Sequence, residues 1–208
     1  ETTAYNNYVY SNSITTSEQN GRGVSLVTTA YNNSIYNNTI TTSNINSYGV
    51  YLDTTAYNNN VYLNTITTSG SLGVGVYLIR TVYNNSIYSN SITTTGASSW
   101  GIRLRIDVYN NTIYSNNITT TNIDAYGIYL TPNVFNNTFY DNNITTKNTA
   151  SSYGIYFLDE VTNNTFYRNS ISSLAAGIVF NGTDTGDDGN TIGVIYNNLF
   201  TNDTIVPC

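Results

Sequence analysis

One phrase recurs along this chain at a fixed interval of 26 residues. It is opened in turn by Tyr5, Tyr31, Tyr57, Tyr83, Tyr109 and Phe135. The copies YNNSIYNNTITT at 31–42 and FNNTFYDNNITT at 135–146 show how closely the phrase is kept. A period of roughly 20–50 residues is typical of solenoids, in which each repeat is one coil. The period therefore constrains the fold more than any other feature of the sequence.

The residue types in the repeat favour strands. Val, Ile, Thr and Tyr are abundant, and Tyr alone occurs 21 times. In three segments of each coil, apolar residues alternate with polar or aromatic ones, which is the period of a half-buried strand. We therefore expect an all-β fold, a right-handed parallel β-helix (β-solenoid) with about 26 residues per coil and 7–8 coils. A single domain is expected over 1–208, with regular coils in 5–180 and an irregular C-terminal part in 181–208.

Four columns of the repeat have predicted structural roles. Asn at positions 3 and 8, counted from the opening Tyr, is expected to form sharp corners and amide ladders along the axis. Ile at position 10 is expected to stack in the core, so that Ile92 is buried between Ile66 and Ile118. Gly at position 19 is expected to mark a corner at the start of the third strand.

The phrase N-x-I-Y-x-N-x-I, repeated from residue 5 to about residue 180, resembles the repeat of right-handed parallel β-helix proteins, the pectate-lyase-like superfamily. It is most similar to Asn-, Tyr- and Thr-rich secreted or surface members of that group. The resemblance implies the fold. It implies no single function, because the superfamily includes polysaccharide lyases, hydrolases, epimerases, phage tailspikes, adhesins and structural proteins.

Charged side chains are few, and most of those with catalytic potential gather at positions 21–25 of the coils. They are Asp53, Arg80, Arg103, Arg105, Asp107, Asp159 and Glu160. Their alternating signs are typical of weak surface ion pairs. The chain has no His, so the commonest general base is missing. We expect no enzyme, no catalytic residues, no cofactor and no metal site, and Asp184–Asn190 is interpreted as a turn and not as a calcium loop.

Two Tyr columns are expected to face outward, one at position 6 and one at position 21. A surface stripe of stacked aromatic rings is typical of an interface with another subunit or with sugar rings. The second column consists of Tyr51, Tyr77, Tyr129 and Tyr156. The predicted interface residues are Tyr5, Tyr10, Tyr36, Tyr62, Tyr88, Tyr114, Tyr140, Tyr167, Tyr196 and Cys208. Cys208 is the one cysteine, and it could form an intermolecular bond or have no role.

Other surface features keep further interpretations open. Thr-Ile-Thr at 39–41 and 65–67 forms ranks similar to those of ice-binding proteins, but Asn117 and Asn143 interrupt them. Sequons are dense, and the predicted glycosylation sites are Asn32, Asn37, Asn181 and Asn202. The net charge of −6 argues against nucleic acid as a partner, and no apolar run is long enough to predict a membrane span.

The first residues, Glu1–Ala4, copy the coil end Asp53–Ala56, so coil 1 follows without a predicted cap. The exposed strand edge is either a trimmed end or a docking surface. We expect a non-enzymatic structural subunit of a secreted, extracellular or cell-surface filament or fibre, whose partner is a second copy of itself stacked head to tail. The alternatives are a carbohydrate-binding or carbohydrate-cleaving β-helix domain, with a polysaccharide as partner, and an ice-binding β-solenoid.

Overall fold

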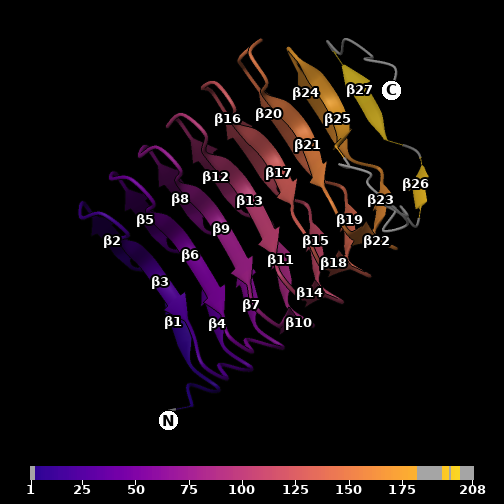
Figure 1. The fold of residues 1–208 in the computed structure, drawn as a ribbon. Coiled ribbons are helices and arrows are strands. Elements are labelled where there is room, and N and C mark those ends of the chain that lie inside the picture. Colours follow the sequence, from indigo (N-terminus) through magenta and orange to yellow (C-terminus); the bar gives the residue numbers. More distant parts are fainter. Residues whose placement is uncertain (1–2, 182–193, 197, 202–208) are drawn as a thin grey trace.

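A computed structural model describes residues 3–181, 194–196 and 198–201 of the chain. Every regular element in these ranges is a β-strand, and every strand pairing is parallel. Strands of successive coils lie side by side in sequence order from the N-terminal to the C-terminal end (Figure 1). The prediction of an all-β, parallel β-solenoid is therefore confirmed, with about seven turns.

Three long sheets form the walls of the solenoid, and a short fourth sheet lies at one corner. The first contains β1 (Tyr8–Tyr10), β4 (Ser34–Tyr36), β7 (Asn60–Tyr62), β11 (Ser86–Tyr88), β15 (Thr112–Tyr114), β19 (Thr138–Tyr140), β23 (Thr165–Tyr167) and β26 (Val194–Tyr196). The second contains β2 (Ser13–Thr16), β5 (Thr39–Thr42), β8 (Thr65–Thr68), β12 (Ser91–Thr94), β16 (Asn117–Thr120), β20 (Asn143–Thr146), β24 (Ser170–Ser173) and β27 (Leu199–Thr201).

The third sheet contains β3 (Arg22–Leu26), β6 (Tyr48–Asp53), β9 (Val74–Ile79), β13 (Trp100–Arg105), β17 (Tyr126–Leu130), β21 (Tyr153–Leu158) and β25 (Ala176–Asn181). The short sheet contains β10 (Val82–Tyr83), β14 (Val108–Tyr109), β18 (Val134–Phe135) and β22 (Val161–Thr162). One strand from each long sheet makes up a coil, as the three segments of the repeat predict.

The core consists of aliphatic ladders that run along the axis. Ile92 pairs in register with Ile66 on one side and Ile118 on the other, and it is 1% exposed, so that prediction is confirmed. Phe139 and Phe166 replace Ile at equivalent inward positions and stack with ring centroids 4.4 Å apart. Identical side chains therefore repeat at the strand spacing of about 4.8 Å, and each coil buries the face of the next.

The Gly column serves close packing, and the prediction that it marks a corner is wrong. Gly75 and Gly101 lie inside β9 and β13 with an ordinary strand backbone. A Cβ added at Gly75 would lie 2.6 Å from the carbonyl oxygen of Gly101 in the next coil. Only Gly permits this approach between neighbouring strands.

The sharp corners are formed by the residues immediately before the ladder Asn side chains. At position 2, Asn84 and Asn110 have φ of 55°. At position 7, Leu63 and Arg168 adopt the same left-handed region, with φ of 55° and 53°. The sequence assigned both the bend and the ladder to the same Asn. In the structure, the residues at positions 2 and 7 form the bends, and the Asn residues at positions 3 and 8 form the ladders.

The segment expected to be irregular contributes two more strands to the solenoid. β26 pairs with β23, and β27 pairs with β24. Asn198 continues the position-8 ladder, because its Oδ1 accepts the backbone N–H of Asn169 at 2.9 Å. The described part of the chain thus begins an eighth coil on two of the three walls.

Candidate functional site

The two Asn columns form hydrogen-bond ladders that have a direction. In each step, the Oδ1 of one Asn accepts both the backbone N–H and the Nδ2–H of the Asn in the preceding coil. Between Asn85 and Asn111, these two bonds measure 2.9 and 3.0 Å. The Nδ2 of Asn111 also donates to the backbone carbonyl of Val82 at 3.0 Å. Each ladder Asn therefore directs its Oδ1 acceptor toward the N-terminal end of the rod and its backbone N–H toward the C-terminal end.

Coil 1 ends this pattern with acceptors that have no donor in the described part of the chain. Asn7 and Asn12 donate to Asn33 and Asn38 in coil 2, but no described donor reaches their own Oδ1 atoms. Around them, Tyr8 is 68% exposed, whereas its partners on the inner coils are half-buried. Within the described residues, β1 and β2 are therefore edge strands of their sheets, and the coil-1 ladder positions accept no hydrogen bond.

The predicted Tyr column at position 6 is a continuous stack on the outer surface. Ring centroids from Tyr10 through to Tyr167 are 4.8–5.1 Å apart, and their planes differ by 1–9°. A parallel stack begins at Tyr5 and ends at Phe135, with separations of 5.0–5.2 Å. Since each ring covers the face of its neighbour, both columns present mainly ring edges to solvent, which stabilises the coil stacking.

The Tyr column at position 21 is not exposed, contrary to the prediction. Tyr51, Tyr77 and Tyr129 are 4–9% exposed, although they lie on the outer face of the third sheet. They pack with Trp100 and Ile79 into a second apolar cluster outside the solenoid core. The sequence pattern correctly placed these rings outside the core, but it could not show that large neighbours at position 18, such as Trp100, cover them.

One of the predicted surface ion pairs has a buried carboxylate and an exposed Arg. Asp53 is 4% exposed and accepts hydrogen bonds from Arg80 Nε at 2.6 Å and from the Tyr51 hydroxyl at 2.9 Å. Burial alone would raise the pKa of the Asp53 carboxyl, but hydrogen bonds from Arg80, Tyr51 and Thr54 together lower it. Burial and the hydrogen bond to Asp53 raise the pKa of Tyr51 to about 12. The interpretation of Asp53 as part of a weak surface pair is therefore wrong.

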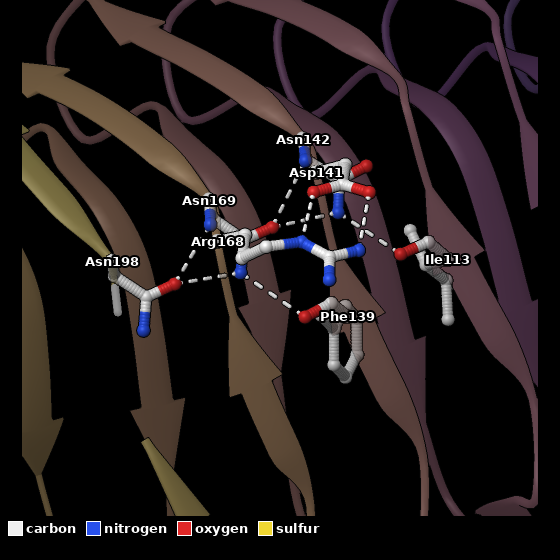
Figure 2. A network of polar contacts seen from close by, with 7 residues as sticks. All are labelled: Ile113, Phe139, Asp141, Asn142, Arg168, Asn169 and Asn198. Carbon is white, nitrogen blue, oxygen red and sulfur yellow. Dashed lines mark hydrogen bonds and ion pairs between the residues drawn. The ribbon is translucent and has the colours of Figure 1, made fainter. Parts of the chain in front are cut away.

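A second ion pair joins coils at the position-7 corner, and the sequence analysis missed it. Arg168 donates to both carboxylate oxygens of Asp141, at 2.7 and 2.8 Å (Figure 2). The pair lies beside the Asn142–Asn169–Asn198 ladder and is exposed on both sides. The hydrogen bond from Arg168 lowers the pKa of Asp141. Asp141 and Arg168 both occupy position 7 of their coils when the extra residue in coil 6 is counted, so the repeat could have indicated this pair.

Among the described residues, the other predicted acidic residues belong to no metal-binding cluster. Asp107 and Glu160 are exposed in turns with positive φ, and the described ranges contain no cluster of three or more His, Cys, Asp or Glu that could hold a metal ion. No helix within those ranges could cross a membrane.

Three of the predicted glycosylation sites, Asn32, Asn37 and Asn181, are exposed. Asn202, Cys208 and Asp184–Asn190 lie outside the described residues, and Tyr196 is described only by its backbone pairing with Tyr167.

The Thr ranks on the second sheet keep their predicted orientation. Ile66 is buried between Thr65, which is exposed, and Thr67, which is half-buried. Asn117 and Asn143 occupy the outward positions of two successive coils and hydrogen-bond to each other at 3.0 Å. Ice binding stays a prediction.

Comparison with known proteins does not identify a function for this chain, because the chain matches no protein-family model, no curated protein and no solved structure.

Proposed function

We propose that this chain is a non-enzymatic structural subunit that stacks head to tail with copies of itself in an extracellular filament or surface fibre. The observation that carries the proposal is the direction of the Asn ladders. Coil 1 offers Asn7 and Asn12 as acceptors, and a coil of the same repeat carries donors that match them. At the C-terminal end of the described chain, Asn198 supplies such an Asn at the position-8 corner.

The equivalence of the coils supports this partner. Strands pair residue for residue at an interval of 26 over most of the rod, so any coil presents nearly the same upper surface to the next. β26 and β27 already carry two of the walls into an eighth coil. A second copy placed on that coil would continue the parallel sheets and the Ile ladders, as in β-augmentation. Because donors meet acceptors in only one orientation, the contact is head to tail and leads to a filament.

The polar side chains support a structural role over an enzymatic one. The Asn residues at positions 3 and 8 use their side-chain amides in ladder bonds from Asn33 to Asn169. Sugar binding by the position-6 Tyr column is disfavoured, because the ring faces that would stack on a sugar are covered by neighbouring rings.

Assembly of the full chain tests the proposal with one blocking variant and one control. Val9 packs at the open end of the core, and Val9→Lys should place a charge in the joint and prevent elongation. Leu63→Lys adds the same charge at an exposed site in the middle of the rod and should still give filaments by negative-stain electron microscopy. Equal filament lengths for both variants, or no filaments from the parent chain, would contradict the proposal.

A further inference from the structure

The apolar cluster on the outer face of the third sheet encloses a guanidinium group. Arg103, on β13, points into it with its Cζ 4.4 Å from the ring centroid of Trp100, 5.0 Å from Tyr129 and 5.3 Å from Tyr77. Cation–π contacts of this kind hold the guanidinium in place. These ring contacts do not provide hydrogen-bond acceptors for the guanidinium N–H groups, which in water would be hydrogen-bonded to solvent.

Arg103 is more buried than Arg80 and Arg168, whose side chains are 54% and 57% exposed. Arg80 is paired with Asp53, and Arg168 is paired with Asp141. No described acceptor reaches Arg103, and its Nε is buried without a hydrogen-bond partner. Burial lowers the pKa of its guanidinium, which reflects the cost of enclosing the charge. A buried donor without an acceptor destabilises the fold unless something else fills the position.

A second unpaired donor lies in the same cluster. Trp100 is 8% exposed, and its indole Nε1 is buried without a hydrogen-bond partner. Trp100 and Arg103 are on the same strand and in ring contact. Two neighbouring buried N–H donors therefore have no acceptor in the described chain.

We propose that Trp100 and Arg103 form a binding site for a carboxylate. The planar guanidinium fork matches the two oxygens of a carboxylate, and hydrogen bonds between such charged partners are stronger than neutral ones. Arg105 lies two residues further along β13, where its side chain is exposed. This site is independent of the end-to-end contact, which involves coil 1 and the last coil.

The carboxylate can come from two sources. One source is a free small carboxylic acid. The other is an Asp or Glu side chain of a second copy packed against the side of the rod. The chain has 12 acidic residues and 6 basic ones, and exposed carboxylates such as Asp124 and Glu160 are available on the surface. Both sources present the same carboxylate group, so one experiment can detect the site and a second can distinguish the two sources.

The chain contains one Trp, so its fluorescence reports on this site directly. Sodium acetate, titrated into the full chain at constant ionic strength against sodium chloride, should give a saturable change in Trp100 emission that chloride does not give. Arg103→Met, which keeps most of the packing volume, should abolish the change. The matched variant Arg105→Met loses the same charge at an exposed position and should retain it. A circular-dichroism melt checks that each variant is folded.

Arg103→Lys keeps the charge but loses the fork, and it should weaken the acetate response by at least about tenfold. An acetate response that is accompanied by a fall in light scattering identifies a carboxylate of a second copy as the source, and a response at constant scattering identifies a free acid. The site is overturned if the parent chain shows no saturable acetate response, or if a folded Arg103→Met variant responds as the parent does.

Discussion

The Oδ1 of Asn116 accepts the backbone N–H of Asn90 at 3.1 Å and its Nδ2–H at 3.0 Å, and both residues are 1% exposed. The same relationship recurs in every inner coil, so the corner of one coil is tied to the corner of the next through a buried amide. This ladder fixes the register of the coils, and it also gives the rod a direction.

Asn116→Ala should therefore destabilise the chain strongly for a single polar side chain. It leaves two buried donors of Asn90 without an acceptor, and each unsatisfied group costs about 1–3 kcal/mol. The adjacent variant Asn117→Ala is the control, because Asn117 is exposed and should change the free energy of unfolding by no more than about 0.5 kcal/mol. Chemical denaturation measures both. Equal losses for the two variants would show that the buried ladder contributes little.

Gly101→Ala should also destabilise, through overpacking. The new Cβ would lie 2.6 Å from the carbonyl oxygen of Gly127, so neighbouring coils would have to separate. A loss of about 1–3 kcal/mol is expected, against almost no change for Ser91→Ala on an exposed position of β12. If the Gly101→Ala variant melts at the same temperature as the parent chain, close approach of the strands does not explain the column of Gly residues.

The Asp53–Arg80 pair predicts a loss of stability in acid. The pKa of Asp53 is lower in the folded chain than its ordinary value of 3.8, so its contribution is present above that value and is lost as pH falls through the folded pKa. Asp53→Asn should reduce stability at pH 7 and flatten the dependence below about pH 4, as measured by thermal melts. Asp107→Asn, at an exposed turn, should leave the curve unchanged. An unchanged acid dependence in Asp53→Asn would assign the effect to other carboxyls.

The raised pKa of Tyr51 predicts a loss of stability in alkali. Its pKa is raised from 10.0 to about 12 in the folded chain, so the folded state holds a proton that the unfolded state has already lost. Stability should therefore fall as pH rises from 10 to 12. In Tyr51→Phe this fall should be smaller, because the titrating hydroxyl is gone. Stability that does not change between these pH values in the parent chain would contradict the buried environment of Tyr51.

The fold was predictable because the 26-residue period places chemically identical residues in register. Ile66, Ile92 and Ile118 could be assigned to one ladder from their spacing alone. The role of Gly101 was not predictable, because close approach between coils and a left-handed corner both favour Gly. The structure separates them, since Gly101 has an ordinary strand backbone and a carbonyl where its Cβ would be.

The surface was harder to predict, because it depends on side chains that reach across coils. The alternation placed Tyr77 and Asp53 outside the core, but their burial comes from Trp100, Tyr51 and other large neighbours. Asp141 and Arg168 are 27 residues apart instead of 26, because coil 6 has one extra residue. Both occupy position 7 of their coils, outside positions 21–25, where the charged candidates were sought.

The central claim is that the rod extends by end-to-end stacking, and cryo-electron microscopy of filaments assembled from the full chain tests it most directly. The map should show coil 1 of one copy on the last coil of the next, with Tyr10 continuing the position-6 aromatic column across the joint and donors within hydrogen-bond distance of Oδ1 in Asn7 and Asn12. Single rods whose coil-1 face is covered by residues of the same polypeptide, or copies joined with opposite directions, would contradict it.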